Sequence, residues 1–323
     1  MNWRKDLEGN YNKKPLIVLT GPTAVGKTEL SVKLAAMING EIISADSMQV
    51  YKYMDIGTAK VSKEEMRGVP HHMIDILEPQ EDFNVTVFKQ KAKECIADIV
   101  SRNKIPIIAG GTGFYIQAVL NDIDFTEHES DDSLRTELSE YAETYGNEAL
   151  YKKLQMLDPD AAKKIHPNNV KRVIRAIEYC TATGELFSVH NAKESEKISP
   201  YKYAYFVLNR ERNKLYERID KRVDIMLEQG LVSEVQKLIA SGCTRNMISM
   251  QGLGYKEVID YLEGKCSYED MIYIIKRETR HFAKRQLTWF KREKDVIWLD
   301  KDSCTDDKLL SDIKEIIKDK GIL

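Results

Sequence analysis

The sequence predicts an α/β protein in which a parallel sheet is flanked by helices and an all-helical insertion interrupts the chain. Apolar runs typical of buried strands alternate with helical patterns up to about residue 121, and strand character returns only after residue 200. Such alternation predicts parallel strands joined by crossover helices. We therefore expect a core domain formed by residues 1–121 and 200–323, and a helical insertion domain formed by residues 122–199.

Each predicted element follows from its local pattern. Helices are expected at residues 29–38 and 87–101, where apolar side chains repeat at helical spacing. The insertion shows charged helical periodicity broken by glycine and proline, with no convincing strand. Five segments have strand character, namely residues 15–20, 40–46, 104–110, 203–208 and 295–299.

Composition narrows the class of protein. The chain has 323 residues, of which 42% are hydrophobic, so a sizeable core is expected. Its apolar runs are too short to span a bilayer, and the start lacks the apolar segment of a secretory signal. The five cysteines are scattered singly, which suits a reducing compartment and argues against a thiolate zinc site. We therefore expect a cytoplasmic, monomeric protein that does not use a membrane.

The net charge of −2 conceals a strong segregation of charge. Residues 122–148 contain ten acids and one base, Arg135, whereas residues 275–294 contain eight bases and two acids. A second basic stripe, Lys163-Lys164 with Lys171, Arg172 and Arg175, lies in the insertion. Asymmetry of this kind is compatible with a nucleic-acid partner despite the acidic total.

A phosphate-binding loop is the strongest motif in the chain. Residues 21–28 match G-x-x-x-x-G-K-[ST] and lie between a predicted strand and a predicted helix, as a P-loop NTPase-like fold requires. Backbone N–H groups, the helix N-terminus and one lysine would hold a diphosphate, and the threonine could reach Mg²⁺. The expected diphosphate-binding residues here are Gly21, Pro22, Thr23, Ala24, Val25, Gly26, Lys27 and Thr28.

The motif alone does not say which diphosphate is bound. Nucleotide-hydrolysing domains usually place an aspartate at the end of a neighbouring strand as a magnesium ligand. Here the third predicted strand ends in residues 110–113, Gly-Gly-Thr-Gly, whereas the second ends in Asp46. Asp46 could serve magnesium or act as a base on an acceptor, and the sequence leaves both roles open.

An ordered set of further motifs resembles the tRNA dimethylallyltransferases, also called tRNA isopentenyltransferases. The resemblance runs from about Pro15 to Trp298 and rests on more than the P-loop. Its other markers are Asp46-Ser47, residues 54–60 (MDIGTAK), 71–76 (HHMIDI), 110–112 (GGT), 166–168 (HPN), 218–222 (RIDKR), 254–256 (GYK) and 283–289 (AKRQLTW).

The resemblance implies transfer of a dimethylallyl group from dimethylallyl diphosphate to the exocyclic N6 amine of adenosine 37, beside the tRNA anticodon. It implies that Lys27, Thr28 and Arg222 serve the diphosphate with Mg²⁺, and that Asp46 is the general base. The tRNA anticodon stem–loop would contact Asp46, Ser47, Met48, Gln49, Thr112, Arg135, Lys171, Arg172, Val173, Ile174, Arg175, Met250, Gln251, Gly252, Leu253, Gly254 and Tyr255.

The basic segment 275–294 is the second candidate RNA contact. Ile275, Phe282 and Trp289 recur every seventh residue, so they mark one helix face and are expected in the core. Lys284 and Arg285 lie on other faces and would bind RNA phosphates, or could simply be solvated.

Two other functions fit the P-loop. One is an ATP-dependent phosphotransferase acting on a small molecule, with the insertion as a lid. The other is a nucleotide-gated RNA-binding switch without chemistry.

Overall fold

A computed structural model describes residues 13–125 and 132–323 of the chain. The described residues fall into two compact units, one within Met1–Leu120 and Pro200–Leu323 and the other within Asn121–Ser199. The acidic stretch noted above, residues 122–148, lies partly outside the described residues. Within the described residues, no helix has both the length and the apolar character needed to cross a membrane.

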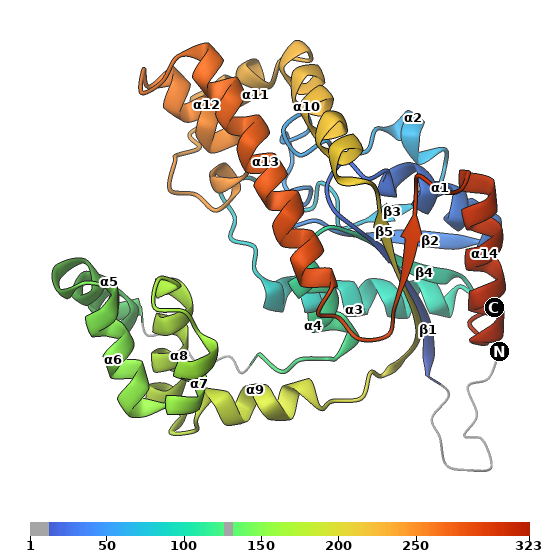
Figure 1. The fold of residues 1–323 in the computed structure, drawn as a ribbon. Coiled ribbons are helices and arrows are strands. Elements are labelled where there is room, and N and C mark those ends of the chain that lie inside the picture. The colour runs from blue at the N-terminus through green and yellow to red at the C-terminus, as the bar shows by residue number, and fades with distance from the viewer. Residues whose placement is uncertain (1–12, 126–131) are drawn as a thin grey trace. The chain divides into compact units, whose positions relative to one another are not determined.

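A six-stranded sheet, entirely parallel, forms the centre of the first unit (Figure 1). Its spatial order is β3-β2-β4-β1-β5-β6. The predicted parallel α/β architecture is confirmed, and the sheet gains a strand of only two residues that is too short to leave a pattern in the sequence. The strands are β1 (Lys14–Thr20), β2 (Gly40–Ala45), β3 (His71–His72), β4 (Ile105–Gly110), β5 (Tyr201–Asn209) and β6 (Val296–Asp300).

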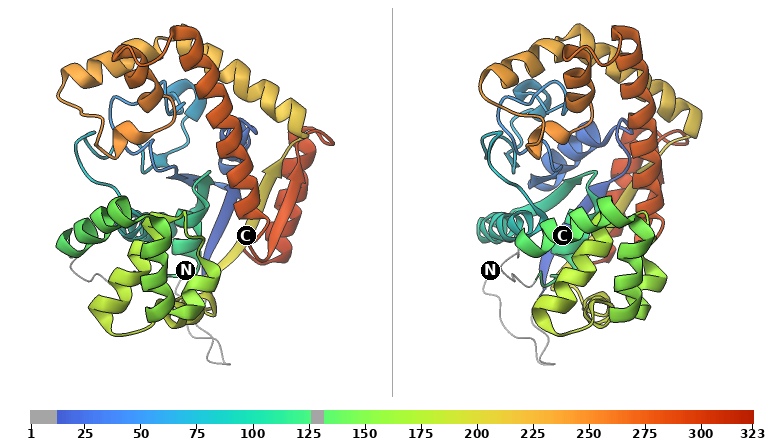
Figure 2. Two further views of the ribbon diagram at one scale, coloured as in Figure 1. Left: turned by 60° about the vertical axis from the view of Figure 1, so that its left-hand side comes forward. Right: turned by 90° about the vertical axis from the view of Figure 1, so that its left-hand side faces the viewer.

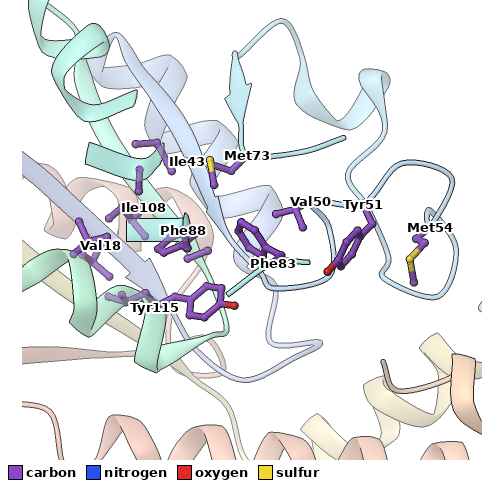
Figure 3. Packing of buried hydrophobic residues seen from close by; sticks show 14 of the residues in the cluster. Val18, Ile43, Val50, Tyr51, Met54, Met73, Phe83, Phe88, Ile108 and Tyr115 are labelled. Carbon is purple, nitrogen blue, oxygen red and sulfur yellow. The ribbon is translucent and has the colours of Figure 1, made fainter. Parts of the chain in front are cut away.

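Helices cover both faces of this sheet, because every central strand is apolar on both sides. On one face α1 (Lys27–Ile38) and α14 (Asp306–Asp319) contribute to one buried cluster. On the other face α3 (Val85–Ser101) and α4 (Gly113–Leu120) contribute to a second. Figure 3 shows part of the second cluster, where the Phe88 and Tyr115 rings stack with centroids 4.7 Å apart.

Helix starts follow from local capping. α3 begins at Val85, two residues before the predicted start, because the Asn84 side chain accepts hydrogen bonds from the backbone N–H groups of Thr86 and Val87, each at 3.0 Å. α1 begins at Lys27, directly after Gly26, whose φ of 102° only glycine adopts readily. The first helical residue is therefore the P-loop lysine.

Of the remaining helices of this unit, one short helix lies between β2 and β3 and the others follow β5. The basic helix α13 begins at Tyr268, earlier than the predicted segment, because Ser267 caps it, and it ends at Phe290. The others are α2 (Lys63–Met66), α10 (Arg212–Glu228), α11 (Leu231–Ala240), the 3₁₀ turn η1 (Ser249–Gln251) and α12 (Tyr255–Leu262).

The second unit contains only helices within its described residues, and they pack around their own core (Figure 2). Asp158 ties two of them together, accepting hydrogen bonds from the Ala161 backbone at 2.9 Å and from the Ser188 hydroxyl at 2.8 Å. The helices are α5 (Asp132–Tyr145), α6 (Asn147–Leu157), α7 (Pro159–Lys164), α8 (Val170–Thr183) and α9 (Phe187–Ser195).

Candidate active site

Three loops meet at the carboxyl edge of the sheet. Because β2, β4 and β1 are neighbours and parallel, the P-loop, the Asp46 turn and the Gly111-Thr112 turn all leave the same edge. Two hydrogen bonds join them: the Thr20 hydroxyl donates to the Gly110 carbonyl at 2.6 Å, and the Thr112 N–H donates to the Ala45 carbonyl at 3.1 Å. This edge therefore holds the predicted phosphate loop and the predicted base together.

The P-loop wraps tightly around its own lysine. Gly21 has a φ of 148°, and a Cβ there would lie 2.6 Å from the Leu208 carbonyl oxygen, so only glycine is accommodated. The Lys27 ammonium donates to the carbonyls of Gly21 at 3.0 Å and Pro22 at 2.8 Å. The only basic side chain inside the loop is thus hydrogen-bonded to backbone oxygens, in a place where it can bind an arriving diphosphate.

Three charged side chains influence one another beside the loop. Burial, reinforced by the Arg222 guanidinium and opposed by Asp46, lowers the pKa of Lys27 to about 7. Burial also lowers the pKa of Arg222, again opposed by Asp46. One guanidinium, and one amine that a bound diphosphate would help to protonate, interact with a single carboxylate, and this balance of charge suits a diphosphate.

Asp46 lies where it can serve either of its two predicted roles. Its Oδ1 accepts a hydrogen bond from the Met48 N–H at 2.9 Å, which fixes the carboxylate at the turn after β2. The side chain lines two cavities, one beside the P-loop helix and one beside Arg222 and Thr112. A carboxylate shared between an anion site and a wider pocket is in position to act on a molecule occupying that pocket.

The wider pocket, here called the main cavity, has a volume of about 400 Å³. Its lining includes Thr23, Asp46, Thr112 and Arg222. Further polar groups, among them Lys256 and Arg285, and a set of apolar side chains from α10, α11 and α13 complete it. The apolar set is Ile219, Val223, Met226, Leu231, Ile275 and Phe282. A lining that combines anion-binding groups with apolar side chains suits a ligand with a charged head and a hydrocarbon tail.

The smaller cavity, of about 60 Å³, tests the prediction of a magnesium site. It presents the Thr28 and Ser44 hydroxyls and the Asp46 carboxylate, which are the hard oxygen donors that Mg²⁺ prefers. No group of three or more His, Cys, Asp or Glu side chains able to hold a metal occurs in the described residues. These donors suit an ion that keeps several waters and takes its other ligands from a bound diphosphate.

Gln286 is a site residue that the motif reasoning did not single out. Its side chain is 6% exposed, and its amide accepts from the Thr23 N–H at 2.8 Å and donates to the Gly111 carbonyl at 3.0 Å. One side chain from α13 thus joins the P-loop to the turn after β4. A signal was present: Gln286 lies four residues after Phe282 and three before Trp289, so it is a polar residue on an apolar helix face.

The glycines of residues 110–113 are explained by close packing. A Cβ at Gly110 would lie 2.3 Å from the Ala45 oxygen, one at Gly111 would lie 2.2 Å from the Gln286 amide nitrogen, and one at Gly113 would lie 2.3 Å from the Trp289 ring. These glycines therefore let β2 and α13 approach the site, which accounts for a strand ending without a carboxylate.

Comparisons with known proteins agree with this geometry. A family model described as IPP transferase matches residues 49–293. The chain belongs to the IPP transferase family. It is 60% identical over 311 residues to a tRNA dimethylallyltransferase of Lachnoclostridium phytofermentans, covering 96% of this chain and 99% of that protein.

Solved structures give the same result for this IPP transferase. A tRNA isopentenylpyrophosphate transferase from Bacillus halodurans is 46% identical, with a TM-score of 0.73 and coverage of 95% of this chain and 97% of the other. A eukaryotic dimethylallyltransferase crystallised while acting on tRNA is 30% identical, with a TM-score of 0.79 and coverage of 95% and 80%.

Residues 250–255 were predicted to contact RNA, and in this IPP transferase all but one of them line the main cavity. Gln251, Gly252, Leu253, Gly254 and Tyr255 line the main cavity. Met250, by contrast, is 0% exposed and packs in the core of the first unit, so its side chain is not available to a ligand.

The three residues after Asp46, which were predicted to contact RNA, have different surroundings. Ser47 and Met48 line the main cavity. The Gln49 side chain accepts from the Ser44 hydroxyl at 3.1 Å and donates to the carbonyls of Thr58 at 3.3 Å and Ala59 at 3.4 Å. Gln49 therefore holds the next loop in place, and these bonds would have to break before its amide could read a base.

The basic helix α13 separates into paired and unpaired charges. Lys276 and Arg280 form ion pairs with Asp224 and Asp220 of α10, so they stabilise the helix pair. Lys284 and Arg285 are exposed and form no ion pair with any described residue. Both line a groove of about 460 Å³ that is formed by His281, Lys284, Arg285, Thr288, Trp289 and Arg292.

Some of the predicted RNA-contacting residues of the helical unit are exposed, and others are buried or paired within the unit. Lys171, Arg172 and Arg175 are exposed on α8. Val173 and Ile174, at 0% and 5% exposure, pack in the core of that unit, which corrects their expected place on an RNA surface. Arg135 pairs with Glu178 at 2.9 Å and is thereby already engaged within the unit.

Proposed function

We propose that this chain is a tRNA dimethylallyltransferase that transfers the dimethylallyl group of dimethylallyl diphosphate to the N6 amine of adenosine 37 and releases diphosphate. Membership of the IPP transferase family and 60% identity to a tRNA dimethylallyltransferase support the reaction class. The observation that carries the donor assignment is the lining of the main cavity, which combines Thr23 and Arg222 with apolar side chains of α10, α11 and α13.

In the proposed reaction the adenosine N6 nitrogen attacks C1 of the dimethylallyl group while the bond from C1 to the diphosphate oxygen breaks. The N–H proton passes to the Asp46 carboxylate, and the electron pair of the broken bond leaves on diphosphate. General-base help of this kind contributes roughly 10²–10⁴-fold. The P-loop N–H groups, Lys27 and Arg222 would stabilise the charge growing on the leaving group.

Mg²⁺ fits the donors found beside the P-loop. Thr28 and Asp46 would hold it together with the diphosphate, and when bound it supplies further positive charge to the leaving group. Since Asp46 lines both cavities, the ion and the acceptor compete for the same carboxylate unless each takes a different oxygen. We assign the base role to Asp46 and place the ion chiefly on Thr28.

The apolar walls favour this donor over ATP. Val223, Met226 and Leu231 can cover a five-carbon allyl group, whereas a nucleotide triphosphate would bring a polar ribose against them. The ATP-dependent phosphotransferase and the nucleotide-gated switch both require nucleotide binding at the P-loop. Neither accounts for the apolar side chains that line the main cavity.

tRNA is the acceptor we propose, and the groove on α13 is a basic surface that adjoins the main cavity. Arg285 lines both this groove and the main cavity, so a phosphate held there would lie beside the opening that a base must enter. Flipping a base out of its stack costs a few kcal/mol, which phosphate contacts by Lys284 and Arg285 would offset. Lys171, Arg172 and Arg175 provide a second basic surface on the helical unit.

A labelling assay tests the proposal. The protein is incubated with Mg²⁺, an unmodified anticodon stem–loop and labelled dimethylallyl diphosphate, and parallel reactions receive ATP or GTP in place of the donor. We expect label in RNA that carries adenosine at position 37, and none when that base is changed to guanosine. Turnover of ATP without labelled RNA would overturn the assignment. Gel filtration and cell fractionation test the expected monomer and its cytoplasmic place.

A further inference from the structure

The loop of residues 54–60, which follows the Asp46 turn, is held by one buried carboxylate from a distant helix. Glu234 of α11 is 9% exposed. Its Oε2 accepts from the backbone N–H groups of Asp55 at 2.9 Å and Ile56 at 2.8 Å, and its Oε1 accepts from the Gly57 N–H at 3.0 Å. A carboxylate placed this way fixes the backbone path of the whole turn.

Glu234 also accepts a fourth hydrogen bond, from Tyr255, which lines the main cavity. The Tyr255 hydroxyl donates to Oε1 at 2.7 Å, which completes the about four hydrogen bonds that a carboxylate can accept. The Tyr255 ring packs directly on Gly57, where an added Cβ would lie 2.5 Å from the ring. Glu234 therefore sets the position of Gly57 and Tyr255 relative to each other.

Two of the four residues bonded to Glu234, Gly57 and Tyr255, face the site. Gly57, Thr58, Gly254 and Tyr255 all line the main cavity, together with Asp46. The other end of the loop is tied to the Asp46 turn, because Gln49 donates to the carbonyls of Thr58 and Ala59. One carboxylate outside the cavity thus determines the shape of a continuous stretch of its wall.

The loop is also held by a second set of bonds that does not involve Glu234. The Lys60 ammonium donates to the Tyr51 carbonyl at 2.8 Å and to the carboxylates of Asp55 at 2.6 Å and Asp75 at 2.5 Å. These bonds keep the loop attached when Glu234 changes. Loss of Glu234 should therefore shift this part of the wall rather than unfold it.

We propose that Glu234 is a positioning residue for the transfer reaction, acting through the 54–60 loop and Tyr255 to hold the acceptor base in line with the donor. This inference rests on the proposed function. A displacement of about 1 Å in a site that orients two reactants can cost about 100-fold in rate. The P-loop and Gln286 do not contact Glu234, so the affinity for the diphosphate head should remain.

The test compares Glu234→Gln with Glu228→Gln, a matched control because Glu228 is exposed on α10 and makes the same change of charge. The glutamine keeps the shape of Glu234 but presents one NH₂ group where two donors now point. In Glu234→Gln we expect the kcat for transfer of label from the donor to RNA to fall about 10- to 100-fold. The Kd for inorganic diphosphate should stay within about twofold of the wild-type value. Glu228→Gln should match the wild type.

A second variant keeps the inference testable if Glu234→Gln does not fold. Tyr255→Phe removes only the hydroxyl, and we expect it to fold with a modestly lower melting temperature, because one buried hydrogen bond is lost, and to lower kcat about three- to tenfold. In the double variant the two losses should not multiply, because both act on one contact. Normal kcat in Tyr255→Phe, or in a folded Glu234→Gln, would refute the positioning role. Absence of transfer by the wild type would instead refute the proposed function.

Discussion

The low pKa of Lys27 predicts that this protein takes up a proton when diphosphate binds. In the free protein, burial and the nearby Arg222 hold the Lys27 pKa at about 7 rather than the ordinary 10.5. A diphosphate bound in the P-loop brings negative charge next to the amine, which favours its protonated form. Binding should therefore return the Lys27 pKa toward its ordinary value.

The size of the effect follows from the two pKa values. At pH 8 an amine of pKa about 7 is about one-tenth protonated, so binding should take up about 0.9 proton, whereas at pH 6 the uptake should be only about 0.1. Affinity should accordingly rise as the pH falls from about 10 to 7. For the free protein the sign is opposite: over that range the unfolded state binds more protons, so this group makes folding more stable as the pH rises.

Isothermal titration calorimetry measures the proton directly. Inorganic diphosphate is titrated into the protein at pH 8 in two buffers of different ionisation enthalpy, and the difference in heat gives the number of protons exchanged. The Lys27→Met variant supplies the control, since diphosphate itself titrates near this pH and contributes equally to both proteins. We expect the wild type to take up about 0.9 proton more than the variant.

Equal proton uptake by the wild type and Lys27→Met at pH 8 would contradict this reasoning. It would mean that Lys27 is already protonated in the free loop, held charged by the carbonyls of Gly21 and Pro22 that accept its hydrogen bonds. An excess uptake that is as large at pH 6 as at pH 8 would likewise assign the proton to another group.

Three further variants test other parts of the site. Asp46→Asn should retain tRNA binding but lower kcat roughly 10²–10⁴-fold in the labelling assay, and a near-normal rate would remove Asp46 as the base. Gln286→Leu leaves the Thr23 N–H and the Gly111 carbonyl without their partner, so the Kd for diphosphate should rise about tenfold or more, whereas unchanged affinity would show that the loop keeps its shape alone. Changing Lys284 and Arg285 together to alanine should reduce the salt dependence of tRNA affinity by about one or two phosphate contacts, and an unchanged slope would make them ordinary solvated residues.

The fold and the phosphate loop were predictable because both depend on local sequence patterns. Strand-length apolar runs and helical periodicity predict a parallel sheet, and the spacing from Gly21 to Thr28 requires a tight turn before a helix. Parallel strands also place their carboxyl ends on one edge, which is why Asp46 and Thr112 could be expected near the P-loop.

The spacing of residues in the sequence could not predict which side chains are buried or form internal hydrogen bonds. Val173 and Ile174 lie between exposed bases in the sequence, yet the helix turns them into the core of their unit. Gln49 lies two residues beyond Ser47, yet it bonds to the 54–60 loop instead of lining the main cavity. A contiguous motif includes residues on every face of its element, and packing decides which of them reach a ligand.

By itself the sequence determined the sheet, the phosphate loop and the position of Asp46 at the end of a neighbouring strand, since each depends on residues close together in the chain. Only the tertiary structure decided that Gln286 and Glu234, both far from that loop in sequence, hold the site's backbone in place. The physical reason is that a buried polar side chain must find its hydrogen-bond partners across the fold. Those partners are fixed by how helices pack on the sheet, which no local pattern records.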